Sequence, residues 1–363
     1  MSNIVKDLEK QQRSGEELNL DALLPWMKNH IPNIDSNPVI TQFSGGASNW
    51  TYRLKFDEQD IILRRAPLGK KAAGAHDMPR EFYLQQKLKP HYPYVPKMIA
   101  VCEDESVLGS TFYLMERLEG IILRKNPPRG IHWDEETVRK ICYSFWDKMI
   151  HLHQVDYKKE GLQDLGKGEG YIERQILGWN KRYANAKTWN VPAGKKVMKW
   201  LESNIPKEEN LCIIHNDFRL DNVVIDPSNP ENILGVLDWE LAAIGDPLMD
   251  LGNSLAYWVE EKDDFFVKSI RRQPSNIPGM LTREEIINYY CEKTGRTIDD
   301  FRFYRVYGLF RLAGIVQQIY YRYSKGYTKN KAFKNFWLVS IYLIKTCENI
   351  IKRKKKLLTN NYF

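Results

Sequence analysis

Two hydrophobic periodicities divide the chain near residue 120. Before it, apolar and polar positions alternate, which is the period of half-buried strands. Five strands are predicted on this basis, at residues 39–43, 49–56, 61–64, 98–103 and 111–118. An amphipathic helix is predicted at 79–88, and one or two short helices within 1–36. This order indicates a small antiparallel sheet accompanied by one helix.

Beyond residue 120 the apolar spacing becomes helical. A long helix is predicted from Asp134 to about His153, and the strongest later helical signal covers 301–323. Short apolar strands interrupt the helices at 212–214, 223–225 and 233–237. The sequence therefore predicts an α+β fold in two lobes, residues 1–118 and a mostly helical 119–363, joined near 118–120.

Composition and charge change this picture little. The 363 residues are 43% hydrophobic and 28% charged, which is typical of a soluble globular protein. Part of the net charge of +8 comes from a basic run at 352–356. Such runs bind nucleic acid, anionic lipid or phosphorylated ligands in some proteins, but no nucleic-acid motif accompanies this one. We interpret it as a solvated helix end and expect no specific nucleic-acid partner.

Other signals of location and metal binding are weak. The first 20 residues are polar, and no apolar run approaches the ~18 residues of a membrane span. The five cysteines are widely spaced, which argues against a disulfide framework or zinc site. His151 and His153 lie two apart on a predicted helix, so their imidazoles diverge. We expect a cytoplasmic protein and leave its oligomeric state open.

The sharpest chemical signal is the segment from His215 to Asn222, followed by Asp238. Kinase catalytic loops have the spacing H-x-D-x-x-x-x-N, with a metal-binding Asp one β-hairpin later. Asp217 and Asn222 hold that spacing, and residues 223–237 supply the hairpin. Phosphoryl transfer needs a carboxylate that orients the attacking hydroxyl, and oxygen ligands for Mg²⁺. The alternative, polar residues that only cap turns, does not explain this spacing.

This loop resembles that of the aminoglycoside phosphotransferase family, which typically runs H-G-D-x-x-x-x-N. More narrowly, the chain resembles the branch of kinase-like domains found fused to acyl-CoA dehydrogenases. The motifs that carry the resemblance span about residues 38 to 330 and are F-S-G-G-A-S-N at 43–49, Arg174-Gln175 with Trp179, D-F-R-L-D-N at 217–222, L-D-W-E at 237–240, G-D-P-L-x-D-L at 245–251, and Tyr321-Arg322-Tyr323 with Gly326. The resemblance implies a two-lobed protein-kinase-like fold, Mg·ATP as the donor and a small-molecule hydroxyl as the acceptor.

The resemblance also implies roles for individual residues. Asp217 is implied to be the catalytic base, Asn222 and Asp238 the magnesium ligands, and Asp250 a support for the catalytic loop. Asn216 departs from the family pattern, because it stands where the loop usually has glycine. Asn tolerates unusual backbone dihedrals better than most residues.

A second departure concerns the nucleotide phosphates. Arg64 stands where protein kinases have the Lys of the third strand, and Arg is not equivalent to Lys. Its guanidinium can still clamp phosphate oxygens, with Glu81 on the following helix as the expected partner. The alternative is that Arg64 and Arg65 are two surface charges.

Two further segments are expected to bind the nucleotide. The turn after the first predicted strand lies where kinases cover the ATP phosphates, although glycine pairs more often mark ordinary hairpins. Its amide and hydroxyl donors come from Ser44, Gly45, Gly46, Ala47, Ser48 and Asn49. In the expected hinge at 115–118, the backbone of Glu116 and Leu118 would bind adenine. A plain strand end remains the alternative there.

The acceptor is harder to predict. Aminoglycosides are polycations, whereas this chain is basic and has Arg219 inside the catalytic loop. We therefore expect an anionic or CoA-linked hydroxyl compound rather than a true aminoglycoside. The candidate substrate residues are Arg219, Glu240, Arg174 and Trp179.

Two other functions are considered. A pseudokinase, a nucleotide-binding or scaffolding module without transfer activity, is suggested by Asn216 and Arg64, but the base and both metal ligands are present. A protein kinase is less consistent with the sequence, because no A-P-E motif follows and the interval from Asp238 to Pro247 is too short for a regulated activation loop.

Overall fold

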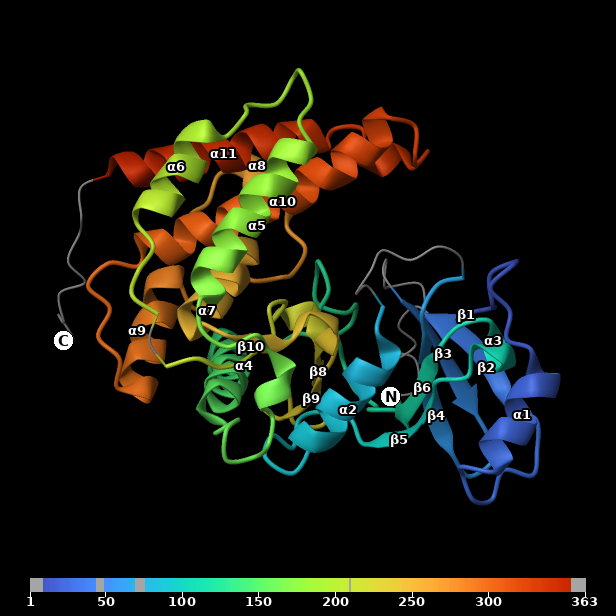
Figure 1. Cartoon of the computed structure of the whole chain (residues 1–363). Coiled ribbons are helices and arrows are strands. Elements are labelled where there is room, and N and C mark those ends of the chain that lie inside the picture. The colour runs from blue at the N-terminus through green and yellow to red at the C-terminus, as the bar shows by residue number, and fades with distance from the viewer. Residues whose placement is uncertain (1–8, 44–48, 69–75, 209, 354–363) are drawn as a thin grey trace. The chain divides into compact units, whose positions relative to one another are not determined.

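The computed structural model describes residues 9–43, 49–68, 76–208 and 210–353 (Figure 1). The chain separates into two compact units, residues 1–145 with 220–241, and residues 146–219 with 242–363. The sequence predicted one boundary after residue 118. In the structure, Ile121 pairs with Ile225, so the segment after 118 lies against the hairpin at 223–236, and both belong to the first unit.

The first unit contains an antiparallel six-stranded sheet in the order β1-β2-β3-β4-β6-β5. The five predicted strands are present as β2 (Val39–Phe43), β3 (Trp50–Lys55), β4 (Asp60–Arg65), β5 (Met98–Cys102) and β6 (Phe112–Glu116). The short edge strand β1 (Glu9–Lys10), which pairs with β2, was not predicted. Two residues carry too little periodicity to mark a strand.

The two faces of this sheet pack against different helices. Ile61 and Leu63 of β4 pack in a core with α1 (Leu20–Lys28) and α3 (Glu105–Leu108), whereas Ile62 packs in a core with α2 (Met78–Leu88). Because side chains alternate along a strand, Arg64 shares the face of Ile62. The strand register therefore points Arg64 toward α2.

A hairpin completes the first unit. It comprises β8 (Val223–Ile225) and β9 (Ile233–Val236), flanked by single 3₁₀ turns η2 (Leu220–Asn222) and η3 (Trp239–Leu241). The segment at Gly120 lies against it so closely that a Cβ there would be 2.5 Å from the Ile225 carbonyl oxygen. Glycine is therefore required at this contact.

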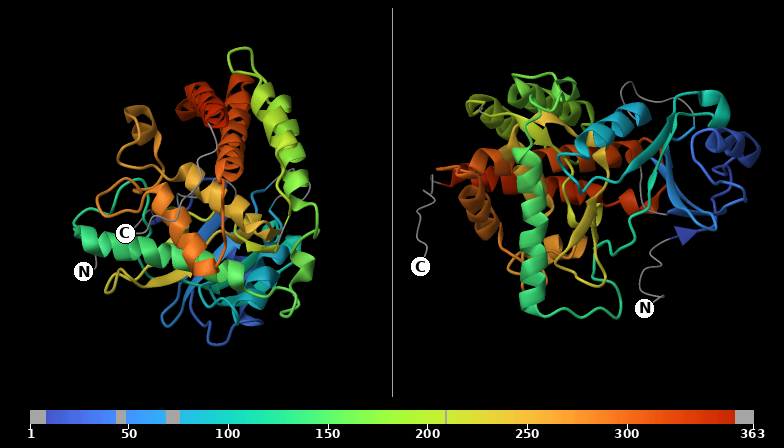
Figure 2. Two further views of the ribbon diagram at one scale, coloured as in Figure 1. Left: turned by 90° about the vertical axis from the view of Figure 1, so that its left-hand side faces the viewer. Right: turned by 90° about the horizontal axis from the view of Figure 1, so that it is seen from below.

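The second unit is mostly helical, as predicted. Its helix α10 (Arg302–Ser324) packs against α5 (Tyr171–Asn185), α7 (Pro247–Tyr257) and α11 (Phe336–Lys352) (Figures 1 and 2). The helix α4 (Glu135–Gln154) continues into this unit from the first. The strands β7 and β10 pair antiparallel. The remaining elements are η1 (Gln163–Leu165), α6 (Lys195–Ser203), β7 (Cys212–Ile214), β10 (Ala243–Gly245), α8 (Phe265–Ile270), α9 (Arg283–Thr294) and η4 (Lys331–Phe333).

Two sequence expectations about the whole chain can be compared with the described residues. All five cysteines are free thiols, and all but the half-buried Cys291 are buried. Among the helices of the described ranges, none combines the length and apolar character needed to cross a membrane.

We expect Gly308→Ala to destabilise the second unit. A Cβ at Gly308 would lie 2.1 Å from the backbone oxygen of Gly252, where α10 crosses α7. Neither backbone can yield without repacking, so the cost should be about 1–3 kcal/mol or more. The matched control is Gly178→Ala in α5, whose Cβ would meet the Arg182 side chain at 3.6 Å. This control should be neutral or slightly stabilising. Urea unfolding midpoints measure both, and similar midpoints would contradict the packing argument.

Candidate active site

A buried carboxylate holds the predicted catalytic loop in the second unit. Asp250 in α7 has 0% exposed area. Its Oδ1 accepts the backbone N–H of Asn216 at 2.8 Å, and its Oδ2 accepts that of His215 at 2.9 Å. His153 Nε2 lies 3.2 Å from Oδ2. Burial raises the pKa of Asp250, but these donors and the two histidines outweigh burial and lower it below its ordinary value.

Asn216 adopts the left-handed backbone conformation that favours glycine, with φ of 64°. Its side chain is anchored, because Tyr171 Oη and Asn253 Nδ2 each donate to Asn216 Oδ1 at 3.2 Å. The departure from the family glycine is thus accommodated by asparagine, which tolerates this conformation better than most residues that carry a side chain.

Asp217, the predicted base, lies beside a guanidinium group. Its Oδ1 is 3.1 Å from Arg219 Nε, and its backbone N–H donates to His215 Nδ1 at 3.2 Å. The guanidinium carbon of Arg219 is in turn 4.8 Å from the centroid of the Tyr257 ring. Arg219 is therefore close enough to orient the Asp217 carboxylate.

In the first unit, the β8–β9 hairpin brings the two predicted metal ligands to one end. Asn222 precedes β8 and Asp238 follows β9, and the Asn222 carbonyl accepts the Leu237 N–H at 2.8 Å. The Asp238 side chain is 32% exposed. Amide and carboxylate oxygens suit Mg²⁺, which binds few protein ligands and keeps waters or phosphates. No group of three or more His, Cys, Asp or Glu gathers to hold a metal among the described residues.

Arg64 lies among three carboxylates in the same unit. The predicted pair with Glu81 is present, with Arg64 Nε 3.5 Å from Glu81 Oε2. Arg64 Nη2 contacts Asp238 Oδ1 and lies 3.8 Å from Glu240 Oε2. Tyr113 Oη donates to Glu81 Oε2 at 3.2 Å. Burial raises the pKa of Glu81 although Arg64 opposes this shift. Arg64 is thus a partly buried cation and not a surface charge.

The neighbouring phosphate-loop residues are only partly described. Ser44, Gly45, Gly46, Ala47 and Ser48 lie outside the described residues. Asn49, next in sequence, donates from Nδ2 to Glu240 Oε2 at 3.0 Å, and its Oδ1 lies 2.7 Å from His76 Nδ1. Glu240, predicted from the sequence to bind substrate, is therefore found beside Asn49 and Arg64.

The predicted hinge residues lie at the end of β6 and just beyond it. The Glu116 N–H donates to the Lys97 carbonyl at 2.9 Å. The Leu118 side chain covers Gly235 of β9 so closely that a Cβ there would be 2.1 Å from Leu118 Cδ1. Glycine at 235 therefore allows the hinge to lie against the hairpin that carries Asp238.

The two candidate substrate residues on α5 differ in their surroundings. Arg174 donates to the carbonyls of Gly168 and Glu169, which lie just before its own helix. Trp179 packs against α10, under the guanidinium groups of Arg182 and Arg311. The sequence analysis missed the supporting residues His153, Tyr171, Asn253 and His76, because only tertiary contacts single them out.

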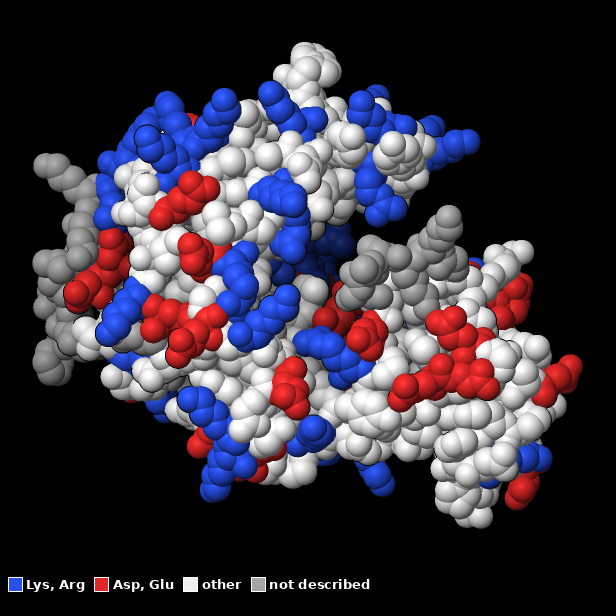
Figure 3. Space-filling model, in the orientation of Figure 1, with Lys and Arg blue, Asp and Glu red and all other residues white. Residues whose placement is uncertain are grey.

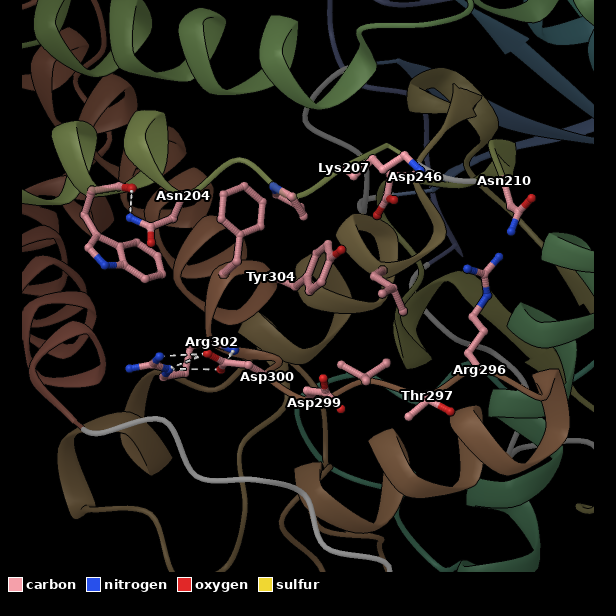
Figure 4. Close-up of a pocket in the computed structure, with 15 residues that line it drawn as sticks. Asn204, Lys207, Asn210, Asp246, Arg296, Thr297, Asp299, Asp300, Arg302 and Tyr304 are labelled. Carbon is pink, nitrogen blue, oxygen red and sulfur yellow. Dashed lines mark hydrogen bonds and ion pairs between the residues drawn. The ribbon is translucent and has the colours of Figure 1, made fainter.

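A separate polar pocket of about 480 Å³ lies in the second unit beside Asp246, the N-cap of α7 (Figure 4). Arg296 extends toward Asp246 and Asn210, while Arg302 pairs with Asp300 at 2.7 Å. Burial raises the pKa of Asp246 to about 6, and hydrogen bonds and Arg296 only partly oppose it. The N-cap of the helix that carries Asp250 is thus sensitive to pH.

Comparisons with known proteins identify the family of the chain. The family model of the phosphotransferase enzyme family (APH) matches residues 39–286, so the chain belongs to this family. It is 34% identical over 310 residues to acyl-CoA dehydrogenase family member 10 of Mus musculus, covering 84% of this chain and 28% of that protein. The chain therefore spans less than a third of that relative's length.

Solved structures give the same class. A Ralstonia eutropha protein assigned to the aminoglycoside phosphotransferases is 31% identical, with a TM-score of 0.79 over 94% of this chain and 100% of that one. A ternary complex of aminoglycoside phosphotransferase APH(4)-Ia with AMP-PNP and hygromycin B shares the fold, with a TM-score of 0.56, 16% identity, and coverage of 90% and 97%. The kinase-like α+β fold is thereby confirmed.

Asn216→Ala should destabilise the protein more than Asn216→Gly. Both variants lose the hydrogen bonds from Tyr171 and Asn253, but only alanine retains a Cβ in the left-handed conformation. That strain costs about 1–2 kcal/mol. Urea unfolding of both variants measures the difference. Equal losses would show that the side-chain contacts alone matter.

Asp246→Asn should remove a pH dependence of stability. Because the pKa of Asp246 is raised to about 6 when folded, its contribution to stability falls as pH rises from about 4 to 6. Asparagine is an equally good N-cap without a charge. The variant should gain up to about 3 kcal/mol at pH 7 and little at pH 4. Unfolding free energies at the two pH values test this, and an equal change at both would contradict it.

Proposed function

We propose that this chain is an ATP- and Mg²⁺-dependent phosphotransferase that phosphorylates a hydroxyl group of a small molecule. The observation that carries the proposal is the end of the β8–β9 hairpin, where Asn222 and Asp238 present oxygen ligands beside Arg64. Five residues before Asn222 in the chain stands Asp217, whose loop Asp250 fixes through two backbone bonds. These are the parts that phosphoryl transfer requires.

The acceptor hydroxyl oxygen would form a bond to the γ-phosphorus while the bond from that phosphorus to the β–γ bridging oxygen breaks and ADP leaves. Asp217 accepts the hydroxyl proton, and Arg219 orients its carboxylate. Mg²⁺, held by Asn222 and Asp238, would neutralise charge on the phosphates.

Arg64 would bind phosphate oxygens of ATP, since its guanidinium already lies at the hairpin end. The Glu116 N–H donates to the Lys97 carbonyl. The proposed adenine contacts are therefore the carbonyl of Glu116 and the N–H of Leu118. Residues 44–48 keep their proposed role as the phosphate loop, with Asn49 anchored to Glu240. The acceptor we propose is anionic or CoA-linked, and a cytoplasmic location belongs to the same proposal.

A second candidate is a nucleotide-binding module without transfer activity. The contact between Arg64 and Asp238 favours it, because this contact engages a predicted magnesium ligand. For transfer activity, bound Mg·ATP would have to break this contact, so that Asp238 binds the metal and Arg64 binds phosphate.

Thermal unfolding with and without Mg·ATP tests the proposed function. A ligand at about 100 times its Kd adds about 2.7 kcal/mol to stability, which should raise the Tm of the wild type by several degrees. ATP without Mg²⁺ should act weakly, and Asp238→Ala should not respond to Mg·ATP. If no protein responds to any nucleotide, the proposed function is wrong.

Turnover separates the two candidates. Asp217→Asn should still respond to Mg·ATP but release ADP at least 100-fold more slowly than the wild type with an accepted substrate. A wild type that binds Mg·ATP and phosphorylates no member of a broad hydroxyl panel would favour the binding module.

A further inference from the structure

Trp179 in α5 lies at the centre of a cationic cluster in the second unit. The guanidinium carbons of Arg182 and Arg311 are 4.5 Å and 5.4 Å from the centroid of its ring. The indole lies against Gly314 of α10, where a Cβ would be 3.0 Å from Trp179 Cε3. The close approach of α5 and α10 at this glycine therefore positions one indole beside two arginines.

Arg311 is buried without an anionic partner. Its side chain is 5% exposed, and among the described residues no carboxylate lies within ion-pair distance of Arg311 or Arg182. The buried Trp179 Nε1 also has no acceptor in the described part of the chain. A buried charge normally has a partner or a bound ligand, because desolvation without compensation is costly. The guanidinium groups of Arg182 and Arg311 and the Trp179 N–H are therefore available to bind an acceptor from outside the chain.

Lysine and arginine predominate on the surrounding helices, in two stretches that lie between Glu173 and Glu202 and before Glu348. Residues 174–201 contain seven Lys or Arg, residues 301–347 contain nine, and neither stretch contains Asp or Glu. Figure 3 shows these cations gathered over α6 and the adjoining ends of α10 and α11. A predominantly basic surface attracts anionic ligands and repels polycations.

The cluster is connected to the catalytic loop within the same unit. Burial raises the pKa of Tyr171 and raises that of Tyr307 to about 12, and the charge of Arg311 partly opposes both shifts. Arg311 is therefore near both rings. Tyr171 donates to Asn216, which directly precedes Asp217 in the chain.

We infer that Arg311, Arg182 and the Trp179 N–H form the subsite for an oxyanion, a carboxylate or phosphate carried by the acceptor molecule. This inference rests on the proposed function and assigns the acceptor's anionic group to named residues. Guanidinium groups bind such oxyanions through two parallel N–H bonds. The acceptor is then a hydroxyl compound that bears its negative charge away from the reacting oxygen.

Binding without nucleotide tests the subsite independently of transfer. Citrate and pyrophosphate, titrated calorimetrically at fixed ionic strength without Mg²⁺, probe carboxylate and phosphate recognition. Arg311→Met should weaken binding of the preferred probe about 10- to 100-fold, and Arg182→Ala less, because Arg182 is exposed. Arg311→Lys keeps the charge but not the paired N–H donors, so its affinity should fall between those of the wild type and Arg311→Met. It serves as the second variant where the methionine variant folds poorly.

The matched control is Lys181→Ala on the same helix, which should change binding less than twofold because Lys181 is exposed and the cations over the Trp179 ring are Arg182 and Arg311. Equal losses for the Lys181 and Arg311 variants would indicate diffuse surface charge and overturn the subsite. Absence of anion binding, or binding unchanged in Arg311→Met, would overturn it too. A wild type that responds to Mg·ATP but binds neither anion refutes this inference alone. Anion binding that depends on Arg311 without any nucleotide response refutes the proposed function.

Discussion

The hydrogen bonds from the His215 and Asn216 amides to Asp250 underlie the rest of the candidate site. A fully buried carboxylate is tolerated only when donors surround it, and here two backbone N–H groups and His153 do so. These bonds fix the backbone immediately before Asp217. They also explain why Asn216 can hold a left-handed conformation, since the surrounding bonds determine the chain path there.

In the first unit, the partly buried charge is the cation Arg64, and carboxylates surround it. Strand alternation places this cation on the face of β4 that meets α2, where Glu81 is buried. Asp238 and Glu240, which follow the hairpin, also lie beside Arg64, so three carboxylates surround its one guanidinium group. In the proposed function, this excess of negative charge at a partly exposed end of the hairpin would attract a metal ion. Arg64 would bind the phosphate oxygens of the nucleotide.

The distribution of charge supports the proposal of an anionic acceptor. The helices that surround Trp179 carry no acidic residue over residues 174–201 and 301–347. The positive charge of the exposed lysines favours an anionic ligand. The two arginines beside the Trp179 indole favour the same kind of ligand.

The sequence by itself determined the strands other than β1 and β10, the helical second half, and the spacing of Asp217, Asn222 and Asp238, because periodicity and loop motifs are local signals. It could not determine the division into units, in which the segment after 118 lies against the hairpin through the pairing of Ile121 with Ile225. Nor could it show that Asn49 donates a hydrogen bond to Glu240, or that Arg311 is buried without a carboxylate partner among the described residues. Those properties depend on which distant side chains meet, and only tertiary packing decides that.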